Sequence, residues 1–166
     1  TLPPDDEDYF RCFKGVTIMI DYLNINLDSN FRKIKIKKDK PIVALISQNF
    51  LKTINCNNLF ESIKQYPLFW IILIGEDSNI LEDEFDNLLE LESIKNNNML
   101  NVVTTNFQFS DLTITDIEDI AYEFLFLPCP NGNCQYLSFL DLNHTADRKI
   151  FDFIETQLNN KATKWS

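Results

Sequence analysis

Short apolar runs bounded by polar residues, Pro or Gly mark the strands of this chain. The longest is Leu68–Ile74, which lies between Pro67 and Gly75 and contains no charged residue. A short uncharged run rich in Ile and aromatic residues is typical of a strand buried on both faces. We therefore expect it to be the central strand of a sheet with helices on both sides. The runs 42–46 and 100–105 predict two further strands.

Helical spacing of apolar residues separates these strands. Residues 47–63 are expected to be helical after Ser47, a residue type that favours the N-cap position. A longer helix is expected from residue 78 or 79 to about 95, and its apolar stripe consists of Leu81, Phe85, Leu88 and Leu89. Two more helices are expected, one at 115–121 and one from Thr145 onward.

The two ends of the chain are less regular. The apolar runs 123–127 and 135–140 flank the turn-like segment 130–133, which predicts an antiparallel hairpin. The segment 10–27 has helical spacing but also a β-branched run, and we expect a helix to about Leu23. Helices that alternate with the first three strands imply parallel pairing, and the hairpin adds antiparallel strands. The expected architecture is a mixed sheet between two helical layers.

Composition indicates one globular domain at 9–166, preceded by an acidic tail at 1–8. The 166 residues are 45% apolar and 24% charged, which is ordinary for such a domain. A net charge of −10 argues against nucleic acid as a partner. The basic run 32–38 is expected to be a lysine-protected edge strand, with contact to an acidic partner as the alternative. Because no apolar run reaches the roughly 18 residues that span a bilayer, no transmembrane segment is expected.

Four cysteines and one glycosylation pattern bear on the compartment. Cys129 and Cys134 flank the predicted turn, where they would form a disulfide or remain thiols. Cys12 and Cys56 would form a second pair or remain buried thiols. Asn143 begins the N-glycosylation pattern Asn-His-Thr. These features favour the secretory pathway, either the endoplasmic reticulum lumen or the extracellular space, with the cytoplasm as the alternative.

The predicted order of elements resembles the thioredoxin fold. Residues 43–50 and 69–74 are similar to the first and central strands of protein disulfide isomerase-type domains. The predicted hairpin with residues 150–154 is similar to their closing unit of two strands and a helix. The resemblance covers about 40–160. It implies an α/β protein with a three-layer α/β/α thioredoxin-like fold, a mixed central sheet, a C-terminal β-hairpin and a closing helix.

The chain departs from that family at the redox centre. The family's CxxC position reads Gly-Glu-Asp-Ser-Asn at 75–79, and no Pro precedes the predicted fourth strand. Thiol exchange needs a thiolate of lowered pKa, so the resemblance implies a redox-inactive domain without enzymatic activity or cofactor. Such a domain binds proteins, acts like a chaperone or serves as a structural spacer. The expected binding surface consists of Glu76, Asp77, Ser78 and Tyr122.

Other chemistry remains open as alternatives. His144 is the only histidine and is expected to be a loop residue; a zinc site would need several converging ligands. The acidic segments 82–92 and 116–119 are expected to be solvated helix faces, with carboxylate catalysis or calcium binding as alternatives. Residues 69–103 also resemble the N-terminal regions of arthropod ionotropic receptors. That resemblance implies an extracellular receptor lobe, flavodoxin-like or periplasmic-binding-like, in which the predicted hairpin would not pack antiparallel beside the central strand.

Overall fold

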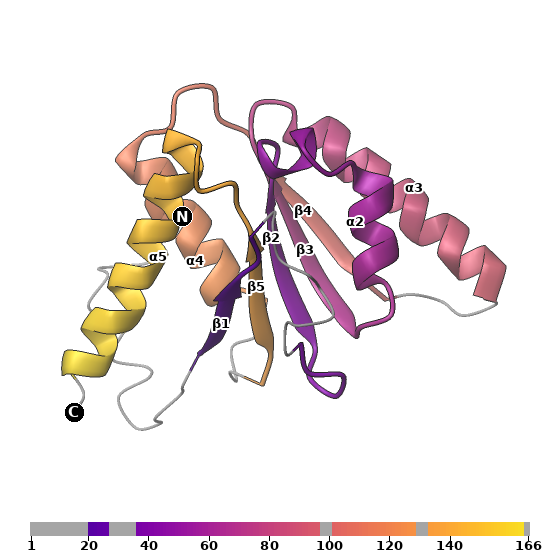
Figure 1. Ribbon diagram of the computed structural model, residues 1–166, viewed down its shortest axis with the longest axis horizontal. Coiled ribbons are helices and arrows are strands. Elements are labelled where there is room, and N and C mark those ends of the chain that lie inside the picture. Colours follow the sequence, from indigo (N-terminus) through magenta and orange to yellow (C-terminus); the bar gives the residue numbers. More distant parts are fainter. Residues whose placement is uncertain (1–19, 27–35, 97–100, 129–132, 165–166) are drawn as a thin grey trace.

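A five-stranded parallel sheet forms the centre of the computed structural model, which describes residues 20–26, 36–96, 101–128 and 133–164 (Figure 1). The strands lie in the order β1-β5-β2-β3-β4, and each adjoining pair is parallel. Their bounds are β1 (Asp21–Asn24), β2 (Ile42–Ser47), β3 (Leu68–Ile74), β4 (Val103–Phe107) and β5 (Gln135–Phe139).

Helices cover both faces of this sheet (Figure 1). They are the 3-10 turn η1 (Phe50–Lys52) and the α-helices α2 (Cys56–Ile63), α3 (Ser78–Asn96), α4 (Ile114–Leu125) and α5 (Thr145–Lys164). Helices α2 and α3 pack on one face, and α4 and α5 pack on the other. The chain runs outward from β2 through β3 to β4, and then α4 leads back to β5 on the other side of β2. The α/β class expected from the sequence is confirmed.

Strand β2 supplies both hydrophobic cores. All six of its residues are buried. Ala44 and Ile46 pack in the core beneath α2 and α3, whereas Val43 and Leu45 pack in the core beneath α4 and α5. Because consecutive side chains of a strand point to opposite faces, an uncharged strand is needed where both faces are covered.

The predicted strand at Leu68–Ile74 is confirmed, but its central position is wrong. It forms β3, second from one edge, and β2 lies in the middle. The first three residues of β3 are only partly buried, and Ile71–Ile74 are fully buried. The predicted stripe of α3 is confirmed, since Phe85 and Leu89 are buried and Leu81 and Leu88 pack against the same core.

The predicted C-terminal β-hairpin and the mixed sheet are wrong. Residues 123–125 are the end of α4, and β5 pairs in parallel with β1 and β2. Phe124 continues the helical stripe of Ile117, Ile120 and Ala121, so the apolar run at 123–127 reflects helical burial. The turn residues 130–132 lie outside the described residues.

The N-terminal expectations are partly wrong. Asp21–Leu23 belong to β1 instead of a helix, because the side chains of Tyr22 and Asn24 bond to Ser138 of β5. Residues 36–38 do not form the predicted basic edge strand; Ile36 is buried in the core instead. The remainder of that run, residues 10–19 and the acidic tail at 1–8 lie outside the described residues.

Candidate functional site

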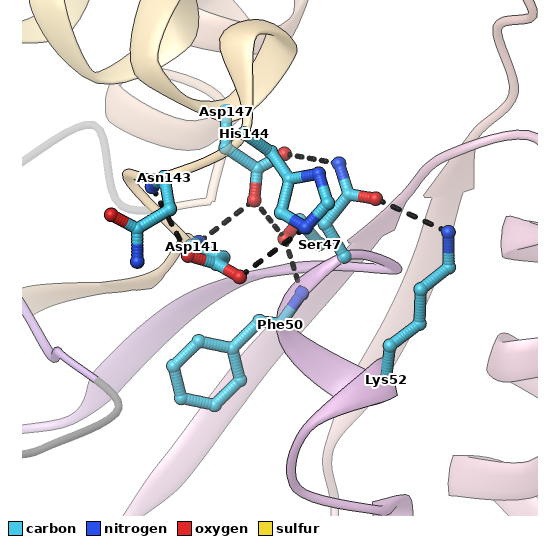
Figure 2. A network of polar contacts seen from close by, with 8 residues as sticks. Ser47, Phe50, Lys52, Asp141, Asn143, His144 and Asp147 are labelled. Carbon is cyan, nitrogen blue, oxygen red and sulfur yellow. Dashed lines mark hydrogen bonds and ion pairs between the residues drawn. The ribbon is translucent and has the colours of Figure 1, made fainter.

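The candidate site lies where β2 and β5 end. These neighbouring strands connect onward in opposite directions, β2 to α2 on one face and β5 to α5 on the other. In open α/β sheets such a topological switch point, at the carboxyl ends of the strands, is where ligands bind. Here it holds a set of polar residues that we call the switch-point network. Ser47, Asp141, His144 and Asp147 are labelled in Figure 2, and Asn49 joins them through its bond to Asp147.

Asp147 is the centre of this network. It lies in the first turn of α5 and is 1% exposed. One carboxylate oxygen accepts from Ser47 Oγ at 2.5 Å and from the backbone N–H of Asp141 at 2.8 Å. The other accepts from Asn49 Nδ2 at 3.0 Å. Asp147 therefore joins α5 to the loops after β2 and β5, as Figure 2 shows.

Ser47 has two bonds in this arrangement. Its hydroxyl donates to Asp147 and accepts from the backbone N–H of Phe50 at 3.1 Å. The second bond satisfies the backbone N–H of Phe50 at the start of η1. The predicted N-cap position of Ser47 is wrong, because the N-cap residue of η1 is Asn49 and that of α2 is Asn55. Ser47 is only 2% exposed.

Asp141 and His144 form the outer part of the network. One Asp141 oxygen accepts from the backbone N–H of Asn143 at 3.1 Å, and the other lies 3.4 Å from His144 Nε2. Asp141 is buried, whereas about half of the His144 side chain is exposed. On the opposite side Lys52 Nζ donates to Asn49 Oδ1 at 3.5 Å.

Burial dominates the electrostatics of Asp147. Loss of solvation raises the pKa of its carboxyl above the ordinary value. The bonds from Ser47, Asn49 and the Asp141 backbone act in the opposite direction, as does the nearby His144. The raised pKa shows that desolvation outweighs these four contributions.

The hydrogen bonds of Ser47 and His144 differ from those of a catalytic triad. Ser47 donates to Asp147, and His144 contacts Asp141, whereas a Ser-His-Asp triad requires the serine to donate to the histidine. The backbone donors that precede α5 already bind the carboxylates of Asp141 and Asp147. An anionic ligand there would meet the carboxylates of Asp141 and Asp147 beside these two loop donors.

The polar contacts continue from β2 to β3. Gln48 Nε2 donates to Asp77 Oδ2 at 3.1 Å, and Gln48 Oε1 accepts from the Asp77 backbone N–H at 2.8 Å. Gly75 makes this close approach possible: its φ is +136°, and a Cβ there would lie 2.6 Å from Gln48 Cβ. At β4, Gln108 Nε2 donates to Asn79 Oδ1 at 2.7 Å.

The predicted binding surface is only partly assembled. Glu76 and Asp77 are exposed at the carboxyl end of β3. Ser78 is fully buried and donates to Asn106 Oδ1 at 3.3 Å. Tyr122 lies in α4, on the opposite face of the sheet from α3, where its ring packs beside Phe126. The structure therefore does not bring Tyr122 together with the other three residues.

The switch-point network was not predicted from the sequence. Its signal is a pair of polar segments that directly follow two apolar runs, Ser-Gln-Asn at 47–49 and Asp-Leu-Asn-His at 141–144. Such segments share one edge of the sheet only if the two strands are parallel neighbours. The predicted antiparallel hairpin placed the two segments at opposite edges of the sheet, so they were not expected to meet.

The cysteine and glycosylation predictions remain predictions. Cys134 and Cys56 are buried, and their proposed partners Cys129 and Cys12 lie outside the described residues. Asn143 is exposed, and Figure 2 shows its side chain directed away from Asp147. The position is thus sterically open to a glycan.

Comparison with known proteins assigns no family to the chain. No protein-family model, curated protein or solved structure matches the chain. Among the described residues, no three His, Cys, Asp or Glu side chains gather as a metal-binding group. Within the same residues, each helix is too short or too polar to cross a membrane.

Proposed function

We propose that this chain is a non-catalytic α/β module that binds another protein. The observation that carries the proposal is the occupied switch point. Asp141 accepts from the backbone N–H of Asn143, and Asp147 accepts from that of Asp141, in the loop where related architectures bind anionic cofactors. The switch point, where sheets of this kind bind ligands, here holds hydrogen bonds that connect two loops to α5.

The redox position supports the same role. The segment after β3 reads Gly-Glu-Asp-Ser-Asn at 75–79, and its Asp77 is bonded to Gln48. A carboxylate in that bond supplies no thiolate for disulfide exchange. The proposal therefore keeps the protein-binding role implied by thioredoxin-like domains, without their hairpin and mixed sheet.

An extracellular receptor lobe is the second candidate, and the parallel pairing of the strands supports it. All adjoining strands are parallel, as in flavodoxin-like and periplasmic-binding-like lobes, and residues 135–139 pair in parallel with β2. The exposed Asn143 supports a location in the secretory pathway. Expression of the chain behind a signal peptide tests whether Asn143 accepts a glycan in that pathway. A glycan is expected that glycosidase treatment removes and that is absent from N143Q.

A ligand screen tests the main proposal. Thermal unfolding of the whole chain is measured with ATP, NAD, FMN and inorganic phosphate, and disulfide reductase activity is measured with insulin. We expect no shift in Tm and no turnover. A saturable rise in Tm with any of these anions, abolished by a substitution at Asn49, would contradict the proposal, as would reductase turnover.

A further inference from the structure

Among the described residues, strand β4 is one edge of the sheet and lacks the Lys and Pro residues that commonly block edge pairing. In the described part of the chain it pairs only with β3. The other edge strand, β1, is charged at Asp21, which binds Lys37 and Lys40. The two edges therefore differ in how readily they accept another strand.

The outward backbone groups of β4 can be identified. The carbonyl of Phe107 accepts from the backbone N–H of Gly75, so Phe107 directs its polar groups toward β3. Alternate residues of a strand direct their N–H and C=O groups to opposite neighbours. Thr104 and Asn106 consequently direct theirs outward, where an added strand would pair with them.

The α3 side of this edge is acidic. Asp86 and Glu82 reach from α3 to the side chains of Thr104 and Asn106. Each carboxylate uses one oxygen in that bond, which leaves its second oxygen for another donor. A strand added to β4 would place every second side chain beside these two carboxylates, and Lys or Arg fits there.

The opposite side of the edge is apolar. Val103 is 41% exposed, and Phe107 is only partly buried. Between them Thr105 Oγ1 accepts from Trp70 Nε1 at 3.1 Å, which holds the half-buried indole beside the edge. The remaining side chains of an added strand would contact this surface, where Val or Ile fits.

We propose that β4 is the docking edge for an extended segment of another protein in which Lys or Arg alternates with Val or Ile. The inference rests on the proposed protein-binding function and names the chemistry of the partner. Main-chain pairing supplies affinity, and the acidic and apolar sides of the edge set the register. A second copy of this chain fits poorly, because its β4 would bring another Glu82 and Asp86 to a chain of net charge −10.

A labelled peptide of four Lys alternating with three Val tests the proposal by fluorescence anisotropy with the whole chain. We expect saturable binding that weakens with salt, and no binding of the same peptide with Glu in place of Lys. A peptide with its four Lys and three Val in separate blocks is expected to bind at least about tenfold more weakly. Hydrogen exchange should slow at the amides of Thr104 and Asn106 when the alternating peptide is bound.

Charge variants locate the site. The double variant E82Q/D86N is expected to bind the alternating peptide at least about tenfold more weakly. D83N/D152N removes the same charge from two exposed positions, one beside Glu82 on α3 and one on α5, and is expected to bind normally because the described contacts to β4 come from Glu82 and Asp86. Equal binding by both variants, no binding by the native chain, or dimerisation through β4 would overturn the inference. If the inference fails, binding of a protein partner that E82Q/D86N does not weaken would still support the proposed function. Binding of an anionic cofactor at Asn49 would contradict the proposed function.

Discussion

Asp147 shows how much one buried side chain does in this fold. Three donors from two loops converge on its carboxylate, at Ser47, Asn49 and the Asp141 backbone. Removal of the carboxylate leaves the buried donors of Ser47 and Asp141, and the partly buried donor of Asn49, without this acceptor. An unsatisfied buried group costs about 1–3 kcal/mol, which exceeds the net contribution of an ordinary hydrogen bond.

Asp147→Ala is therefore expected to lower the free energy of unfolding by about 2–4 kcal/mol. Urea denaturation followed by circular dichroism measures the change. Asp152→Ala is the matched control, because Asp152 lies on the same helix, is exposed and pairs only with Arg148 among the described ion pairs. The control should remain within about 0.5 kcal/mol of the native chain. Equal effects of the two substitutions would contradict the role of Asp147.

The pH dependence of this residue has a defined sign. Burial raises the pKa of Asp147 above its ordinary value of 3.8, so the folded chain binds this proton more readily than the unfolded chain. The contribution of Asp147 to stability is then largest when it is protonated, and it falls as the pH rises from about 3.8 through the raised pKa. Over that interval the unfolding free energy of the native chain should fall relative to that of Asp147→Asn. A difference that moves in favour of the native chain as pH rises would contradict this assignment.

Cys56 is expected to be unreactive in the folded chain. Burial, with the neighbouring Glu84, raises the pKa of its thiol to about 12. At pH 8 only about one molecule in ten thousand would carry the thiolate, which is the nucleophile. Iodoacetamide labelling read by peptide mass spectrometry should be slow in buffer and fast in guanidinium chloride. Fast labelling of the native chain at Cys56 would show that the residue is not held as a buried thiol.

At the scale of elements, α4 shows why the local sequence pattern predicts a strand at 123–127 where the chain forms the end of a helix. Its stripe of Ile117, Ile120, Ala121 and Phe124 has the 3.6-residue period. The apolar run Phe-Leu-Phe-Leu at 124–127, however, covers the end of the helix and the two residues after it. A short run of that kind does not distinguish a buried helix end from a strand. The start of α4 carried a clearer signal, because Thr113 and Asp116 bond each other's backbone N–H groups as a capping box.

Thr113→Ala is expected to lower the free energy of unfolding by about 1 kcal/mol, since it removes the acceptor for the backbone N–H of Asp116. Thr115→Ala is a close control: Thr115 is exposed in the first turn of the same helix. Thermal or urea unfolding of the two variants compares the same chemical change at a cap and beside it. If Thr115→Ala proves the more damaging, the helix does not begin at this capping box.

At the scale of the whole molecule, apolar patterning predicted which segments are strands better than it predicted their neighbours. The runs that became β2 and β3 were identified from Ile, Val and the absence of charge, and the α/β class followed from alternation with helices. Pairing order depends on contacts between distant segments, such as Asn24 with Ser138, and no local pattern contains them. For the same reason the hydrogen bond between Asn49 and Asp147 could not be predicted from the sequence.

The sheet order also predicts the pattern of hydrogen exchange. Strand β2 has a neighbour on each side and is buried on both faces, so its amides should exchange slowest. In β4 the amides of Thr104 and Asn106 should exchange much faster than those of its inward residues. Exchange measured on the free chain by mass spectrometry or NMR tests this order. Protection at Thr104 equal to that in β2 would mean that the outer side of β4 is already covered.

The position of β5 has a consequence for biosynthesis. Strand β1 is made early, yet its partner in the sheet is β5, which also borders β2. A nascent chain emerging from the ribosome can assemble β2, β3 and β4 with their helices, but β1 has no place until residues 135–139 have left the exit tunnel. A stop codon before residue 135 would therefore remove β5 and α5 from the polypeptide and leave β1 without its neighbour in the sheet.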